Sequence, residues 1–201
     1  MRCTLVLASA SPARAATLRA AGVDPRVVVS GVDESQVHDP DPAVLVLLLA
    51  ELKGRAVVDR LEAAQDGWLL ACDSMLELDG EALGKPADAA DAVRRWQRMR
   101  GRSGVLHTGH YLVDLTLGTE VRRSVATTVH FADVTDAEIE AYVATGEPLQ
   151  VAGAFTVDGL GGPFVTGIEG DHHNVVGLSL PLLRELLGDI GVGWFDVAQG
   201  K

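Results

Sequence analysis

The stretch that decides the fold reads Thr4-Leu5-Val6-Leu7-Ala8-Ser9-Ala10-Ser11-Pro12-Ala13-Arg14. Its first part, Thr4 to Ala8, is mostly apolar and predicts a short buried strand. Ser11 can cap a helix with its hydroxyl, Pro12 suits the first helical position, and Gly22 is a stop signal. A strand, a tight loop and a helix are therefore the first unit of a predicted α/β fold.

The segments that follow extend this pattern. A second strand is predicted at Val27–Val29, and a long helix opens at Asp41-Pro42 and ends near Gly67. The next predicted elements are a buried strand Trp68–Cys72 that ends at Asp73, a hairpin with Met75–Leu78 and a turn at Asp79-Gly80, and an amphipathic helix Asp88–Met99.

The second half of the chain is richer in β-structure. Two long segments, Val105–Leu115 and Val121–Phe131, flank Gly118 and predict an antiparallel ribbon. Thr135-Asp136-Ala137-Glu138 matches a capping box, and Gly146 ends that helix. The remaining expected elements are short strands near Phe155 and Val165, a last helix from Ser179 or Leu180 to Leu187, and a fraying end, Asp196–Lys201.

Length and charge limit the possible functions. A chain of 201 residues has room for one substantial core, or for two small lobes that share one. We find no internal repeat or linker, so residues 1–201 are expected to form a single domain. The 17 Lys and Arg against 28 Asp and Glu give a formal net charge of −11, which repels nucleic acid polymers and anionic membranes. A phosphate ligand must then be small and locally neutralised.

Targeting signals are not evident in the sequence. The apolar run Leu5–Ala8 is too short for a signal peptide, and the longest apolar run, Ala43–Ala50, is less than half a membrane span. Cys3 and Cys72 have apolar neighbours and are interpreted as two reduced core thiols. These features predict a cytoplasmic protein that is neither secreted nor inserted in a membrane.

The loop between the first strand and the first helix is a candidate phosphate site. Ser9, Ser11 and Arg14 would supply two hydroxyls and a guanidinium beside the free N–H groups of a helix N-terminus. The alternative is that Ser11 only caps the helix and Arg14 points to solvent.

Acidic residues offer a second candidate site. Asp73 ends an apolar strand, where an acid is either exposed at the edge of the sheet or unexpectedly buried, although it could equally form the turn before the hairpin. Asp33 and Glu34, after the second strand, would add a carboxylate for a hard cation such as Mg²⁺. Taken alone, a solvated acidic loop is the simpler interpretation of that pair.

Other residues carry weaker signals. Lys53 and Lys85 are suited to holding phosphate oxygens, with Gly84 and Pro86 fixing the backbone around the second, although an isolated Lys often serves only solubility. The glycines of Gly159-Leu160-Gly161-Gly162 lack the spacing of a dinucleotide-binding fingerprint and predict a turn. The close pairs His107/His110 and His172/His173 lack the spacing of a zinc site. No Walker lysine motif or G-x-S-x-G elbow occurs.

Taken together and in order, these segments resemble the Maf family of nucleotide pyrophosphatases. The resemblance spans nearly the entire chain. The matching segments are Leu7–Arg14, Val32-Asp33-Glu34, Leu49-Ala50 with Lys53, Cys72-Asp73-Ser74, Leu83-Gly84-Lys85-Pro86, Thr108-Gly109, Gly146-Glu147-Pro148, Ala152-Gly153-Ala154-Phe155 and Asn174-Val175-Val176-Gly177-Leu178.

The resemblance implies an elongated, two-lobed α/β fold with a mixed central sheet and a cleft between the lobes, similar to the inosine triphosphate pyrophosphatases and often dimeric, so that a homodimer is among the expected assemblies. It also implies hydrolysis of a nucleoside triphosphate between the α and β phosphates, giving a monophosphate and diphosphate. Mg²⁺ or Mn²⁺ would be held by Asp73 and Glu34, with Asp73 also the general base. Ser9, Ser11, Arg14, Lys53 and Lys85 would bind the phosphates.

Base specificity is where the chain departs from the family. Members carry Arg or Trp where this chain has Ala13, Thr or Gln where it has Ser74, and Gln or Glu where it has Asp158. The pattern of the dTTP- and UTP-type members therefore cannot be transferred. An acid at Asp158 is able to accept hydrogen bonds from guanine, and Ala13 leaves room for the base, so we expect purine or broad specificity. Gly104 and Val105 also replace a family His and Glu.

Two other functions remain open at this level. The first is a nucleotide-binding regulator of cell division with little or no turnover. The second is a phosphohydrolase that releases nucleoside diphosphate and phosphate from the same cradle. Binding without hydrolysis would identify the regulator, and the identity of the products would identify the phosphohydrolase.

Overall fold

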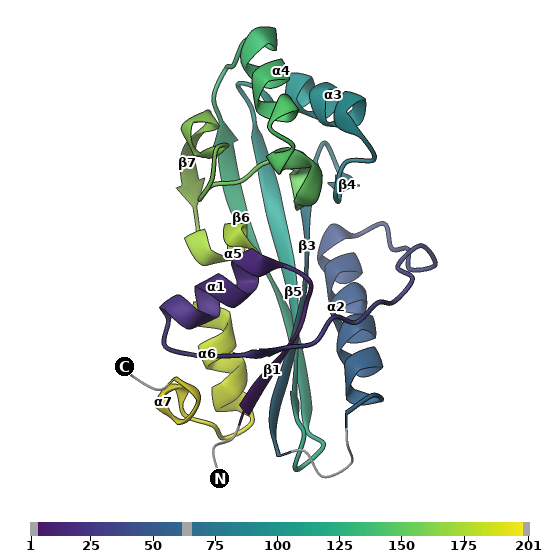
Figure 1. The fold of residues 1–201 in the computed structure, drawn as a ribbon, viewed down its shortest axis with the longest axis vertical. Helices are drawn as coiled ribbons and strands as arrows, with labels where there is room; N and C mark the ends of the chain where they lie inside the picture. The colour runs from purple at the N-terminus through teal and green to yellow at the C-terminus, as the bar shows by residue number, and fades with distance from the viewer. Residues whose placement is uncertain (1–3, 62–65, 199–201) are drawn as a thin grey trace.

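A seven-stranded mixed sheet forms the centre of the molecule in the computed structural model, which describes residues 4–61 and 66–198 (Figure 1). The strand order is β2-β1-β3-β5-β6-β7, and β4 pairs with β3 outside this path. The strands are β1 (Thr4–Ala8), β2 (Arg26–Val27), β3 (Gly67–Leu78), β4 (Glu81–Leu83), β5 (Ser103–Asp114), β6 (Glu120–Phe131) and β7 (Val165–Glu169).

The sheet changes direction at β3. Strand β1 is parallel to both β2 and β3, whereas β3, β5, β6 and β7 pair antiparallel in succession. Strands β3, β5 and β6 each have 12 residues and run along most of the length of the molecule (Figure 1). The predicted α/β fold with a mixed sheet is confirmed.

Helices cover both faces of this sheet. α2 packs on β3 and β5, whereas α5 and α6 contact β5 and β6 on the face that α1 also covers. The α-helices are α1 (Pro12–Ala20), α2 (Pro42–Val58), α3 (Ala89–Met99), α4 (Asp136–Ala144), α5 (His172–Val176), α6 (Leu180–Asp189) and α7 (Trp194–Val197), and the short 3-10 helices are η1 (Glu147–Gln150), η2 (Ala152–Ala154) and η3 (Gly162–Phe164).

The apolar core is divided between the two ends of the sheet. The first lobe holds one cluster between the sheet and α1 and α6, around Leu18 and Leu186, and another under α2, around Val57. The second lobe, with α3 and α4 at the upper end of Figure 1, is built around Trp96. The Trp96 ring meets those of Phe131, Tyr142 and Phe164 edge to face.

Two predicted boundaries around β3 are wrong. The long helix ends at Val58 and not near Gly67, because Gly67 already belongs to β3, where it pairs with Thr4 of β1. A Cβ at Gly67 would lie 2.4 Å from the Thr4 carbonyl oxygen, so this glycine serves strand pairing and does not stop a helix. Strand β3 then continues through Asp73 to Leu78 without a break.

Differences also occur near the C-terminus. The predicted strand near Phe155 is wrong, since the chain turns there through η2 with positive φ at Gly153 and Ala154. Helices α5 and α7 were not predicted, because each spans only four or five residues and shows too little periodicity. Within the described ranges no helix is both long and apolar enough to span a membrane. Cys3 and residues 199–201 of the expected frayed end lie outside the described residues.

Candidate functional site

Asp73 lies in the middle of β3, on the sheet face that α2 covers. Its register partner in β5 is Gly109, and a Cβ at that glycine would lie 2.3 Å from the carbonyl oxygen of Val46 in α2. The α2 backbone therefore packs directly on β5 beside Asp73. Asp73 itself is only 7% exposed. The structure shows an unexpectedly buried acid rather than an exposed strand end or a turn.

Lys53 extends from α2 to two carboxylates. Its Nζ donates a hydrogen bond to Oδ1 of Asp73 and lies 3.0 Å from Oε2 of Glu34. The Lys53 side chain is 13% exposed and that of Glu34 is 47% exposed, so one ammonium group pairs with both a buried and a half-exposed acid. The neighbouring Asp33 is exposed and accepts from the Ser35 backbone N–H in a local turn. The structure brings Glu34, Lys53 and Asp73 together.

The buried position of Asp73 changes its acidity. Burial raises the pKa of this carboxyl group, because the charged form loses its hydration, while the Lys53 ammonium and the Arg14 guanidinium oppose part of that rise. The net direction is upward. A carboxylate with a raised pKa is a stronger proton acceptor near neutral pH than an exposed aspartate.

Arg14 approaches β3 from α1, and the protein itself uses most of its hydrogen-bonding capacity. Nε donates to the Gly177 carbonyl oxygen at 2.7 Å, and Nη1 donates to the Cys72 carbonyl oxygen at 2.7 Å and to Ser9 Oγ at 3.4 Å. Nη2 donates to Ser74 Oγ at 2.9 Å. The alternative that Arg14 points to solvent is wrong. Its guanidinium joins α1, β3 and the end of α5, and has few donors left for a ligand.

The serines before α1 organise their own loop. Ser9 is buried, and its Oγ accepts from the Ser11 backbone N–H at 3.1 Å. Ser11 caps α1 by accepting from the Arg14 backbone N–H at 3.4 Å. The predicted cap is confirmed. The loop leads from β1 to the N-terminus of α1, and β1 lies directly beside β3, so the loop opens toward the segment that carries Asp73.

Behind Arg14 a buried polar chain runs from the predicted specificity residue Ser74 to Thr108 and Asn174, for which no functional role was predicted. Ser74 Oγ lies 2.9 Å from Thr108 Oγ1, and the Thr108 hydroxyl donates to the Asn174 carbonyl oxygen at 3.2 Å. Asn174, fully buried, donates from Nδ2 to Leu106 and Thr127. Thr108 and Asn174 belong to segments already matched to the family. Their polarity within apolar surroundings was the available signal.

Lys85 is exposed and lies in the connection between β4 and α3. The preceding Gly84 carbonyl oxygen accepts from Arg95 Nη1 at 2.7 Å and from the Gly153 backbone N–H at 3.1 Å. Asp91 accepts from the Ala87 backbone N–H at 3.1 Å. The loop backbone is therefore held on both sides of Lys85.

A pocket of about 330 Å³ brings two of the predicted base-specificity residues together. Ala13 contributes from α1, and Asp158 contributes from the loop before η3. Ser74 does not line this pocket, and its hydroxyl accepts a hydrogen bond from Arg14. The other lining residues are Ala16, Thr17, Ala20, Ala21, His172, His173, Val176 and Leu180.

The glycines of residues 159–162 form the predicted turn. In the described part of the chain, no group of three or more His, Cys, Asp or Glu side chains could hold a metal ion. His172 and His173 meet edge to face with ring centroids 5.3 Å apart. Gly159 and Gly161 form a turn that packs closely on Glu147 and Tyr142, since a Cβ at either would lie within 2.6 Å of those side chains.

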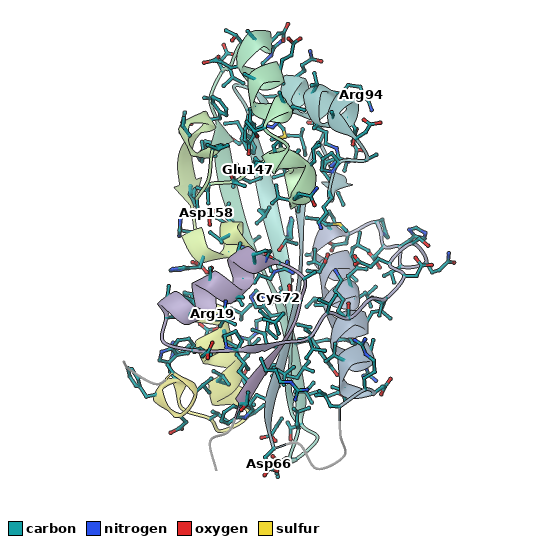
Figure 2. All side chains as sticks on the ribbon, viewed as in Figure 1. Arg19, Asp66, Cys72, Arg94, Glu147 and Asp158 are labelled. Carbon is teal, nitrogen blue, oxygen red and sulfur yellow. The ribbon has the colours of Figure 1, made fainter. Side chains whose placement is uncertain are left out.

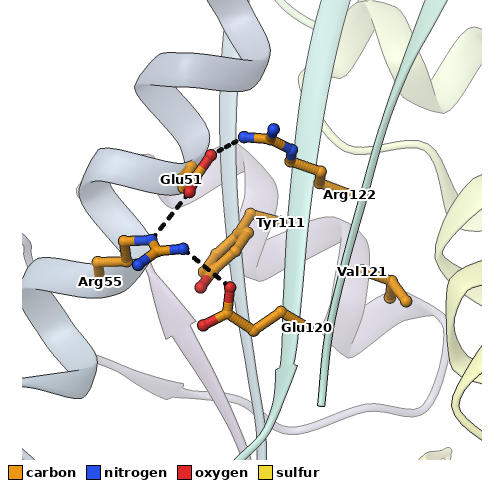
Figure 3. Close-up of a pocket in the computed structure, with 6 residues that line it drawn as sticks. All are labelled: Glu51, Arg55, Tyr111, Glu120, Val121 and Arg122. Carbon is orange, nitrogen blue, oxygen red and sulfur yellow. Dashed lines mark hydrogen bonds and ion pairs between the residues drawn. The ribbon is translucent and has the colours of Figure 1, made fainter. Parts of the chain in front are cut away.

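A second cavity, of about 210 Å³, contains none of the predicted site residues (Figure 3). Arg55 of α2 lies between Glu51 and Glu120, at 2.9 and 3.1 Å, and Arg122 pairs with Glu51. The four charges balance one another within the cavity. Ion pairing between α2 and β6 accounts for this arrangement without a ligand.

Comparisons with known proteins give one consistent family. The family model described as "Maf-like protein" matches residues 4–190. A protein of Salinispora tropica named "Nucleoside triphosphate pyrophosphatase" is 63% identical over 94% of this chain and 84% of its own length. One of Gloeothece citriformis with the same name is 50% identical, covering 99% of this chain and all of its own.

Among solved structures, the Staphylococcus aureus Ham1 protein covers 97% of this chain and 93% of its own, with 14% identity and a TM-score of 0.46. A dITP/XTP pyrophosphatase of Mycobacterium abscessus covers 65% of this chain and 75% of its own, with 18% identity and a TM-score of 0.40.

Proposed function

Because the chain belongs to the Maf-like protein family, we propose that it is a nucleoside triphosphate pyrophosphatase, which hydrolyses the bond between the α and β phosphates and releases a nucleoside monophosphate and diphosphate. The observation that carries this proposal is the partly buried Lys53 ammonium group between Asp73 and Glu34. Lys53 belongs to α2, which packs on β3. Strand β3 pairs with β1, and β1 leads into the Ser9–Ser11 loop. An ammonium group, carboxylates and a helix N-terminus can together bind phosphates and stabilise the charge that develops in phosphoanhydride hydrolysis.

The two carboxylates also suit a divalent cation. Mg²⁺ is commonly bound by one or two protein carboxylates and completes its coordination with substrate phosphates and water. Asp73 and Glu34 both contact the Lys53 ammonium group, so these two carboxylates are the proposed ligands of such an ion. Bound Mg²⁺ or Mn²⁺ would polarise the phosphoryl oxygens and neutralise developing negative charge. With two carboxylates as its only protein ligands, the ion is expected to arrive with the triphosphate.

Proton transfer and phosphate binding would then depend on the protein's own residues. Asp73 accepts the proton of the attacking water, which the bound cation would make more acidic. Lys53 keeps a third N–H for a phosphate oxygen while its other two contact carboxylates. Ser9, Ser11 and the N-terminus of α1 bind the phosphates, and Lys85 reaches them from the second lobe. Arg14 contributes mainly charge, since the protein occupies most of its donors.

The pocket between Ala13 and Asp158 is the proposed base site. Asp158 is exposed, and its carboxylate is able to accept from the N1–H and exocyclic amine of guanine. The methyl group of Ala13 leaves space where a larger side chain would meet the base. We therefore expect the enzyme to favour purines, guanine above all, or to be broad in its choice.

The first test is a product analysis. The full-length protein is incubated with Mg²⁺ or Mn²⁺ and a panel of standard and modified nucleoside triphosphates, and the products are separated by chromatography. Monophosphate with diphosphate is the expected result. Release of a nucleoside diphosphate and inorganic phosphate would instead identify the phosphohydrolase. Nucleotide binding without any turnover would identify the regulator.

The matched variant is Asp73→Asn. We expect turnover to fall by about 10²- to 10⁴-fold while nucleotide binding persists, since a general base is lost and the phosphate-binding groups remain. The control is Asp59→Asn, which makes the same chemical change at an exposed position after α2. An Asp73→Asn protein that turns over at the wild-type rate would exclude Asp73 as the base.

A further inference from the structure

Glu147 is a partly buried carboxylate on which four hydrogen-bond donors converge. Its Oε1 accepts from the Tyr142 hydroxyl at 3.0 Å, the Thr156 hydroxyl at 2.6 Å and the Gly161 backbone N–H at 3.2 Å. Its Oε2 accepts from the Leu160 backbone N–H at 3.0 Å. Three of these donors belong to a single short loop, residues 156–161.

The loop that Glu147 holds also carries Asp158. In Figure 2 both residues are labelled, Glu147 in the second lobe and Asp158 at its lower side, toward α1 and α5. Asp158 has Gly159 on one side, and a Cβ at that glycine would lie 2.6 Å from Oε2 of Glu147. The loop backbone thus lies directly against the carboxylate, one residue from Asp158.

The other end of the network is rigid. The Tyr142 hydroxyl accepts from the Thr156 backbone N–H at 3.2 Å, and the Tyr142 ring contacts Trp96 and Phe164 edge to face, with centroids 5.6 and 5.5 Å apart. Glu147 itself lies in η1, directly after α4. The loop is therefore attached to the aromatic core of the second lobe.

The charge state of Glu147 supports this arrangement. Burial alone raises the pKa of this group, but the hydrogen bonds from Thr156, Leu160, Tyr142 and Gly161 outweigh burial and hold the pKa below its ordinary value. Glu147 therefore stays ionised at neutral pH. An ionised carboxylate accepts all four bonds, whereas an amide at the same place would direct its NH₂ group at another donor.

We propose that Glu147 is a positioning residue for base selection: by fixing the loop 156–161 it sets where the Asp158 carboxylate stands in the pocket opposite Ala13. This inference rests on the proposed function, and specifically on Asp158 as the base contact. It assigns no role to Glu147 in hydrolysis itself. If the loop moved, the ratio of kcat/KM values for nucleotides with different bases would change. A purely structural role would change only the amount of folded protein.

The test compares GTP with UTP. The ratio of their kcat/KM values is measured for the full-length wild type, Glu147→Gln, Asp158→Asn and the double variant, with Glu140→Gln, an exposed glutamate of α4, as the matched control. We expect Asp158→Asn to lower the GTP:UTP ratio about tenfold, and Glu147→Gln to lower it by several-fold in the same direction. In the double variant Glu147→Gln should add nothing to the ratio, because its effect acts through Asp158.

The outcomes separate the inference from the proposed function. Equal losses for GTP and UTP in Glu147→Gln would overturn the inference and leave a purely structural role. An unchanged ratio in Asp158→Asn would overturn both the base contact and the inference, with pyrophosphatase activity intact. If the wild type releases no diphosphate, the proposed activity fails, and the same ratio taken from dissociation constants still tests Glu147.

A second variant guards against a Glu147→Gln protein that does not fold. Thr156→Val removes one hydroxyl that donates to Glu147 and accepts from the Gly161 backbone N–H at 3.2 Å, and it leaves the carboxylate in place. We expect a smaller fall in the GTP:UTP ratio with an unchanged circular dichroism spectrum. A ratio equal to that of the wild type in this folded variant would count against the inference.

Discussion

His110 is a buried imidazole whose ring joins β5 to the start of α6. Its Nδ1 lies 3.2 Å from the Thr108 carbonyl oxygen, and its Nε2 accepts from the Ser179 backbone N–H at 2.9 Å. Both contacts fit the neutral ring with its proton on Nδ1. Burial first, and the Arg14 charge to a lesser degree, lower the pKa of His110 to about 4.

The lowered pKa of His110 predicts a loss of stability in mild acid. The unfolded chain binds a proton at this residue below about pH 6.5, whereas the folded protein does so only near pH 4. The contribution of neutral His110 to the free energy of unfolding is therefore complete above about pH 6.5. It decreases by about 1.4 kcal/mol per pH unit as the pH falls toward 4. Urea unfolding at a series of pH values measures it.

The comparison for this prediction is His110→Gln, with His172→Gln, an exposed histidine, as the control. We expect the stability of His110→Gln to depend less steeply on pH between 6.5 and 4 than that of the wild type or the control. Parallel curves for all three proteins would show that another group governs acid unfolding.

Single residues were predictable from sequence where their partners are close in the chain. The cap of Ser11 on α1 and the capping box of Thr135 with Glu138 involve neighbours three residues apart, so local chemistry was sufficient. Arg14 bonds to Gly177, 163 residues away, and only the fold brings them together. Lys53 and Asp73 are also distant in sequence. Only the family resemblance, and not the residues around them in the chain, predicted that they share a site.

At the scale of elements, the packing of α2 on the sheet depends on two glycines. Gly109 lets the helix backbone approach β5, and Gly54 lets the ring of Tyr111 lie against the helix, where an added Cβ would stand 2.3 Å from a ring carbon. In a helix interior Ala is ordinarily better than Gly by about 0.5–1 kcal/mol. Here the contact should outweigh that preference.

We therefore predict that Gly54→Ala destabilises the protein by about 1–3 kcal/mol, as overpacking does in a close-packed core. Gly188→Ala in α6, where nothing lies within 4 Å of the added methyl group, should stabilise by up to about 1 kcal/mol. Urea unfolding of both variants gives the comparison. Equal stabilisation by the two substitutions would mean that α2 does not rest on Tyr111 as closely as described.

The elements themselves were predicted unevenly. Strong local signals located β1, α1, α3, the β5–β6 ribbon and α4. The end of α2 and the length of β3 were missed, because Gly67 suggests a helix stop in sequence whereas its role is to pair with β1. Phe155 was taken for a strand residue, but its ring packs against Phe131 with centroids 5.0 Å apart, and apolar character alone does not distinguish these cases.

For the whole molecule, the prediction that the chain is a single domain can be tested through cooperativity. Strands β3, β5 and β6 contribute to the cores of both lobes, so the loss of one core should undo the other. Ile139 in the second lobe and Leu186 in the first are each 1% exposed. We expect Ile139→Ala and Leu186→Ala each to cost about 2–5 kcal/mol.

The measurement is native-state hydrogen exchange of the slowest amides in each lobe. Either substitution should lower the opening free energy of those amides by the same amount at both ends of the molecule. If Ile139→Ala lowers protection only around α3 and α4, the second lobe opens as a separate unit and the single-domain prediction is wrong.

The long strands shared by the lobes also decide how the molecule can move. Hinged enzymes close by changing the dihedral angles of a few loop residues, but here the lobes are joined chiefly by hydrogen-bonded strands. Narrowing the pocket between Ala13 and Asp158 then requires elastic bending of the sheet. Elastic strain would therefore build up in the sheet when a bound triphosphate bends it. The sheet should relax to its original shape when the products leave.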